Sequence, residues 1–217
     1  MGSWKDQFPK ENRYFETDSG ILYLGDCLEI MKEFPKKSIK LILTDPPYPD
    51  YYTKDFKYNI VQVGVFKDFS CRQFIFWSAK VEFPLDYTAR HVWDKITGAA
   101  NQYDFIYERN GYRRQKVFRG HRINSTVSAR FAKEVFWGHK AQKPINVIQD
   151  ILEYSGVENG VVFDPFLGSG TTAVACERLN RRWIGIEIEE KYCEIAKERI
   201  QREGRRFGLL KLKRRRK

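Results

Sequence analysis

The chain has 217 residues, of which 42% are hydrophobic, 31% charged and 15% aromatic, which is the profile of a folded protein rather than a disordered or fibrous one. No run approaches the roughly 18 consecutive apolar residues of a membrane-spanning helix, and the first residues lack the pattern of a secretion signal. We therefore expect a single cytoplasmic domain over residues 1–217, whose net charge of +11 favours an anionic partner.

Short apolar runs alternate with amphipathic segments along much of the chain. A short apolar run suits a strand buried on both faces, whereas apolar residues three or four positions apart predict a helix. Strand, helix and strand in succession are typical of a parallel α/β sheet. The pattern predicts strands at residues 21–25, 39–43, 73–77, 103–107, 161–163 and 183–188, and helices between Asp26 and Pro35 and at residues 145–154, 171–179 and 189–202.

The positive charge is concentrated in two segments. Residues 109–143 hold ten lysines and arginines against one acid, and residues 205–217 hold eight against none. Clustered cations on an otherwise acidic body favour a polyphosphate such as nucleic acid. Residues 109–140 show no sustained period and are interpreted as an inserted loop region, and residues 205–217 as a flexible basic tail. A solvated loop and a disordered tail would have the same composition, so both interpretations stay open.

Cysteine and histidine spacing argues against a metal centre. The four cysteines form no Cys-x-x-Cys pair, and the three histidines do not lie at zinc-site spacings from them. We therefore expect no metal site and no disulfide framework.

A glycine-rich turn lies between a predicted strand and a predicted helix, at residues 164–172 (Asp-Pro-Phe-Leu-Gly-Ser-Gly-Thr-Thr). Glycines at such a turn let the backbone approach a ligand beyond the carboxyl end of a strand. The turn lacks the Gly-Lys-Ser/Thr of a nucleoside triphosphatase. Glu187 ends the next strand, 23 residues after Asp164, at the spacing where nucleotide-binding folds place an acid on ribose hydroxyls. The pair indicates an adenosine-bearing ligand.

A second motif, Asp45-Pro46-Pro47-Tyr48, follows another predicted strand. The two prolines stiffen the loop and lack backbone donors, so the loop offers acceptors: the Asp45 carboxylate and the Pro46 carbonyl. An amine with two N–H groups would satisfy both, and Tyr48 supplies a ring on which a planar base can stack. A proline-stiffened turn with a packed tyrosine is the alternative interpretation.

The two motifs together resemble those of the amino-group DNA methyltransferases, which transfer a methyl group from S-adenosylmethionine to adenine N6 or cytosine N4. The catalytic motif precedes the cofactor motif, an order similar to that of the permuted beta group. The resemblance implies a Rossmann-like α/β fold with a mixed, mostly parallel seven-stranded sheet. It extends over residues 25–28, 74–78, 139–144 and 183–188.

The resemblance implies roles for the matching residues. Catalysis would rest on Asp45, Pro46, Pro47 and Tyr48. The methionine end of S-adenosylmethionine would be surrounded by the glycine turn, Glu187 would bind its ribose, and Asp26 its adenine amine. The cofactor residues implied in this way are Asp26, Gln142, Lys143, Pro144, Asp164, Phe166, Gly168, Ser169, Gly170, Thr171 and Glu187.

The resemblance also implies the reaction and the target. Acid at the first catalytic position is typical of adenine enzymes and serine of cytosine-N4 enzymes, so Asp45 favours in-line methylation of a flipped-out adenine in DNA. The alternatives are cytosine-N4 methylation and a non-catalytic cofactor- and DNA-binding subunit. None of the four cysteines follows a proline, which disfavours carbon-5 chemistry.

The basic insertion occupies the place where this family carries its target-recognition region. Only about thirty residues are available there, so we expect limited sequence specificity. A homodimer and a restriction endonuclease partner stay open. The expected DNA-binding residues are Arg109, Arg113, Arg114, Lys116, Arg119, Arg122 and Arg130.

Overall fold

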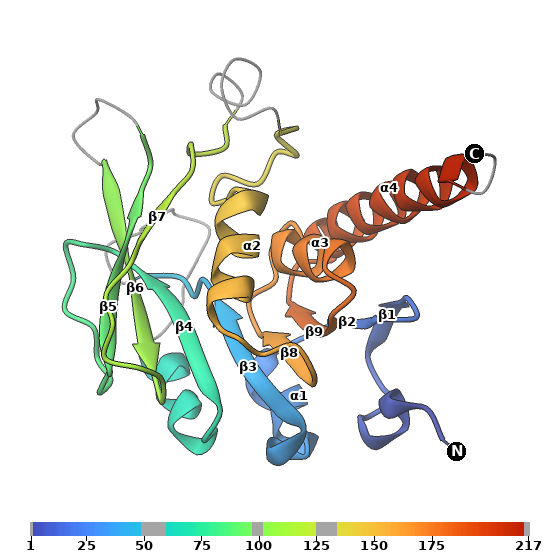
Figure 1. Ribbon diagram of the computed structural model, residues 1–217. Coiled ribbons are helices and arrows are strands. Elements are labelled where there is room, and N and C mark those ends of the chain that lie inside the picture. Colours follow the sequence, from blue (N-terminus) through green and yellow to red (C-terminus); the bar gives the residue numbers. More distant parts are fainter. Residues whose placement is uncertain (1, 49–59, 97–101, 125–133, 215–217) are drawn as a thin grey trace.

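The structure is a computed structural model that describes residues 2–48, 60–96, 102–124 and 134–214. Within these ranges one nine-stranded sheet runs through the molecule (Figure 1), in the order β1-β2-β9-β8-β3-β4-β6-β5-β7. The strands are β1 (Arg13–Glu16), β2 (Gly20–Leu24), β3 (Ile39–Thr44), β4 (Arg72–Trp77), β5 (Ala89–Asp94), β6 (Tyr103–Arg109), β7 (Val117–Arg119), β8 (Val161–Asp164) and β9 (Arg182–Glu187).

The expected fold class is confirmed, but the expected seven strands are wrong. Five of the strand pairings are parallel, and those of β1 with β2, β4 with β6 and β5 with β6 are antiparallel. The additional strands β1 and β7 form the two edges of the sheet. Both are short, and neither carries the apolar run of a central strand.

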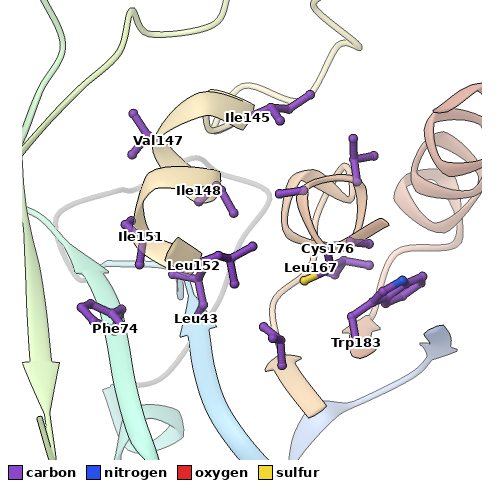
Figure 2. Packing of buried hydrophobic residues seen from close by; sticks show 14 of the residues in the cluster. Leu43, Phe74, Ile145, Val147, Ile148, Ile151, Leu152, Leu167, Cys176 and Trp183 are labelled. Atoms are coloured by element: carbon purple, nitrogen blue, oxygen red, sulfur yellow. The ribbon is translucent and has the colours of Figure 1, made fainter. Parts of the chain in front are cut away.

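Helices cover both faces of the central strands, which explains their continuous apolar runs. Figure 2 shows α2 packing through Ile148, Ile151 and Leu152 above Leu43 and Phe74, beside Cys176 of α3. A second cluster on the other face joins α1, the segments that follow it and the 3₁₀ helix at Ile60–Asp68. The α-helices are α1 (Cys27–Ile30), α2 (Ile145–Tyr154), α3 (Thr171–Arg178) and α4 (Glu190–Arg214), with further 3₁₀ turns at Trp4–Gln7, Met31–Glu33 and Lys36–Ser38.

Two expectations about the basic segments need correction. The insertion is not loop throughout, because Val117–Arg119 pairs in parallel with β5. The tail is not a flexible coil over its described part, because α4 continues through Arg214 and extends beyond the sheet (Figure 1). A search of the described residues finds no helix with the length and apolar character needed to cross a membrane.

Candidate active site

The carboxyl ends of β2, β3, β4, β8 and β9 meet at one edge of the sheet because these strands run in parallel. A cavity of about 710 Å³ opens there, within the range of small-molecule sites. The loops after β2, β3, β8 and β9 line it, together with the residues that precede α2. The two motifs that the sequence singled out therefore open into the same space.

The loop Asp45–Tyr48 forms one wall of this cavity. The Tyr48 hydroxyl donates to Asp45 Oδ1, and the Lys143 ammonium forms an ion pair with Asp45 Oδ2. The Tyr48 ring packs edge-on against Trp77, with 5.5 Å between the ring centroids. The carboxylate is thus held by donors on both oxygens and faces the cavity.

The glycine turn after β8 forms another part of the wall. Gly168 and Gly170 adopt positive φ angles of +54° and +83°, which L-residues with side chains rarely adopt. A Cβ on Gly170 would lie 2.8 Å from the Cβ of Ala196, so glycine also permits close packing of the turn against α4.

Asp164 joins this turn to β3. Its carboxylate is buried and accepts hydrogen bonds from Thr44 Oγ1 and Thr172 Oγ1, each at 2.7 Å, and from the Phe166 amide at 3.1 Å. Burial raises the pKa of Asp164 to about 6, although these three donors favour the ionised form. Asp164 therefore positions the ends of β3, β8 and α3 relative to one another.

Glu187 lies at the end of β9, where it lines the cavity; the residue is 8% exposed. The Gly168 and Glu189 amides donate to it, both at 2.8 Å. Burial raises the pKa of Glu187 to about 7, since these backbone donors only partly offset the loss of solvation. A carboxylate held in this way is suited to bind neutral hydroxyl donors.

Asp26 and Gln142 also line the cavity, but both have structural bonds. Asp26 Oδ1 caps α1 by accepting the Leu28 amide at 2.7 Å. The Gln142 amide group donates to Glu134 at 3.1 Å and accepts from the Trp137 amide at 3.0 Å. Gln142 thus holds the segment before α2 in place, while Pro144 precedes the first residue of α2.

Arg199 of α4 supports the glycine turn and was missed from the sequence. Its guanidinium donates to the Ser169 carbonyl at 2.6 Å, to Ser169 Oγ at 2.8 Å and to Thr171 Oγ1 at 3.2 Å. Because burial lowers its pKa only to about 10, Arg199 stays charged at neutral pH. Arg199 lies three positions from Ala196, on the apolar face of the predicted helix, but that position alone does not show whether its charge is buried.

The seven expected DNA-binding residues separate into three groups. Arg109 is buried and donates to Gln73 Oε1 at 2.7 Å and to the carbonyls of Phe66 and Asp86, so its assignment to a DNA surface is wrong. Arg130 lies outside the described residues. The remaining five are exposed: Arg113, Arg114, Lys116, Arg119 and Arg122.

The fold and this cavity define the Rossmann-like class of methyltransferase folds. The family model for N6/N4 methylases, described as DNA methylase, matches residues 52–198. The chain belongs to this family of N6/N4 DNA methylases.

Similar proteins include type II methyltransferases. M2.DpnII of Streptococcus pneumoniae is 34% identical over 140 residues, 62% of this chain and 46% of that protein. M2.MboI of Moraxella bovis is 27% identical over 255 residues, 86% of this chain and 90% of that protein. M2.LlaDCHI of Lactococcus lactis subsp. cremoris is 45% identical over 71 residues, and this chain spans 26% of its length. The chain thus spans less than half of two of these relatives.

Solved structures share the fold. The M1.HpyAVI–SAM complex superposes with a TM-score of 0.57 at 24% identity, over 82% of this chain and 98% of that one. The PvuII DNA methyltransferase, described as cytosine-N4-specific, gives a TM-score of 0.66 at 15% identity, over 88% and 89% of the two chains.

Gly170→Ala tests the packing of the turn. We expect it to lower the free energy of unfolding by about 1–3 kcal/mol, because the new methyl group combines a left-handed backbone with overpacking against Ala196. Urea unfolding followed by circular dichroism measures the change. Gly204→Ala in α4 is the matched control. The methyl group added there meets nothing within 4 Å, so this substitution should raise the free energy of unfolding by about 0.5–1 kcal/mol. Equal effects of the two substitutions would contradict the packing argument.

Proposed function

We propose that this protein transfers a methyl group from S-adenosylmethionine to the N6 amine of adenine in DNA. The observation that carries the proposal is that the Asp45–Tyr48 loop and the Asp164–Thr172 turn line one cavity. Membership in the N6/N4 DNA methylase family supports the same chemistry. Asp45, rather than serine, at the first position of the loop favours adenine over cytosine.

The cavity fits S-adenosylmethionine on the chemistry of its donors and acceptors. Glu187, buried without a cationic partner among the described residues, suits the two ribose hydroxyls. Gly168, Ser169 and Thr171 of the turn line the cavity, whereas Gly170 packs against α4 and does not line it. Asp26 retains a second carboxylate oxygen for the adenine amine, since Oδ1 alone caps α1. S-adenosylmethionine, when bound, supplies a sulfonium methyl group to a nucleophile.

The catalytic loop acts on the target amine, whose lone pair is delocalised into the base. The Asp45 carboxylate and the Pro46 carbonyl accept the two N–H groups and localise the lone pair for in-line attack. The nitrogen–carbon bond forms as the carbon–sulfur bond breaks, and the electron pair of that bond stays on sulfur as a neutral thioether. The methylated nitrogen then loses one proton through Asp45 to solvent. Tyr48 stacks on the base, which must leave the helix to enter the cavity.

The DNA contacts the basic residues at the cavity end of β7. Arg119 pairs in register with Asp94, the last residue of β5, and Arg122 lines the cavity. Arg114 lies elsewhere, because its carbonyl accepts from Tyr154 at the far end of α2. Tyr154 lies six residues beyond Ile148, which lines the cavity, so the helix carries that end about 9 Å away from the cavity lining.

Asp45→Ala should abolish methyl transfer while cofactor binding persists, because Asp45 accepts a hydrogen bond from the target amine and the glycine turn binds the cofactor. Methyl transfer from radiolabelled S-adenosylmethionine to DNA and calorimetric binding of S-adenosylhomocysteine measure the two properties separately. Asp68→Ala, an exposed acid paired with Lys36, is the matched control and should retain both. Turnover by Asp45→Ala comparable to that of the unmodified protein would refute the mechanism.

Ribose binding should depend on pH through Glu187. Hydroxyl donors favour the ionised carboxylate, so ligand binding lowers its pKa from about 7, and affinity should rise with pH up to about 7 and level off above it. At pH 6 we expect up to about a tenfold weaker affinity for 5′-methylthioadenosine, which has the ribose but no titrating amino acid. Calorimetry from pH 5.5 to about 8.5 tests this range. Parallel pH profiles for the unmodified protein and Glu187→Gln would contradict this role.

The salt dependence of DNA binding tests which basic residues contact the DNA phosphates. Replacing Arg119 and Arg122 by glutamine should reduce the slope of log affinity against log salt by about 1.8, if each contacts one phosphate. Replacing Arg113 and Arg114 removes the same charge at the far end of α2 and should change the slope less. Fluorescence anisotropy with a labelled duplex measures both variants. An equal change in the two would show that only net charge matters.

A further inference from the structure

Lys143 connects the two halves of the cavity. Its backbone carbonyl accepts a hydrogen bond from Thr171 Oγ1 at 3.2 Å, which ties the residue to the glycine turn. Its side chain extends to the other half of the site, where the ammonium pairs with Asp45. The functional end of Lys143 therefore lies at the catalytic loop and not at the cofactor turn.

The surroundings fix the position of this ammonium. Its nitrogen lies 5.2 Å from the ring centroid of Phe76 and 5.6 Å from that of Trp93, as in cation–π contacts. Lys143 is 9% exposed, and Asp45 is the one hydrogen-bond acceptor found for its side chain among the described residues. An ammonium has three N–H donors, so donors remain for a ligand in the cavity that Lys143 lines.

Asp45 and Lys143 together present an acceptor directly beside a donor. Adenine and cytosine carry the complementary pattern, an amine next to a ring nitrogen with a free lone pair. Guanine and thymine carry the opposite pattern at these positions, a carbonyl next to a ring N–H. Either keto base would leave a buried charged donor facing an N–H group, which is strongly disfavoured.

We infer that Lys143 is a specificity residue of the target-base site, donating a hydrogen bond to the ring nitrogen next to the target amine. The inference rests on the proposed function and deepens it. With adenine as the target, Lys143 binds N1 while Asp45 and the Pro46 carbonyl accept the N6 hydrogens. The three contacts fix the plane of the base and so the direction of the amine lone pair.

A double-substitution cycle tests this contact. The protein and Lys143→Met are assayed on duplexes whose target base is adenine, 1-deazaadenine, which lacks N1, or 3-deazaadenine, which keeps it. The target lies opposite an abasic site in every duplex, so that lost base pairing does not enter the comparison. The unmodified protein should lose about ten- to hundredfold in kcat/KM on 1-deazaadenine relative to 3-deazaadenine, as expected for a hydrogen bond from a charged donor. Lys143→Met should show about a twofold difference or less between the same two bases.

Controls separate this role from a structural one. Lys32→Met removes an exposed lysine that pairs with Glu29 and does not line the cavity, and this variant should behave as the unmodified protein. Binding of S-adenosylhomocysteine to Lys143→Met should be unchanged, whereas a loss there would assign the lysine to the cofactor and overturn the inference. Equal turnover of 1-deaza- and 3-deazaadenine by the unmodified protein would also overturn it, whether or not the variant folds. Absence of methylation on adenine itself would overturn the proposed function and the inference together.

Discussion

The active-site geometry depends on the hydrogen bond from Thr44 to Asp164. Thr44 is the last residue of β3, and Asp164 is the last residue of β8, so this 2.7 Å contact joins the strand ends that carry the Asp45–Tyr48 loop and the glycine turn. Thr172 donates to the other oxygen of the same carboxylate and adds the start of α3. A buried carboxylate is costly unless it is hydrogen-bonded, and here each bond to it also sets the position of a functional segment.

The glycine turn is stabilised by hydrogen bonds from a charged side chain of α4 as well as by packing against that helix. Arg199 binds Ser169 and Thr171, and it also reaches Glu134, which accepts the amide of Ile145 at the start of α2. Lys143 lies between the glycine turn and α2, and its ammonium pairs with Asp45. The glycine turn and the Asp45–Tyr48 loop are therefore connected through α2 and α4 as well as through the sheet.

Much of this arrangement could be predicted from sequence because the central strands are buried on both faces. Apolar runs located β2, β3, β4, β8 and β9, and the polar motifs at their ends located both walls of the cavity. Strand β5 was missed because His91 and Arg90 interrupt its apolar residues, although His91 is fully buried and bonds Glu108 at 2.9 Å.

Charged residues were the hardest to assign from sequence. Arg109 carries the same charge as its exposed neighbours, and only the tertiary structure shows its guanidinium bonded to internal carbonyls. Arg199 lies on an apolar helix face, where a charged side chain can either extend to solvent at the edge of the face or be buried and hydrogen-bonded. Local sequence does not distinguish these cases, because burial depends on which segment packs against the residue.

The identity of the methylated nucleoside tests the central claim most directly. The purified protein is incubated with genomic DNA and S-adenosylmethionine, and the DNA is then digested to nucleosides for mass spectrometry. The arrangement of Asp45, Pro46 and Tyr48 in the same cavity as Glu187 predicts N6-methyldeoxyadenosine. N4-methyldeoxycytidine alone would refute the adenine assignment and retain amine methylation, whereas 5-methyldeoxycytidine or no methylated nucleoside would contradict the account of the site.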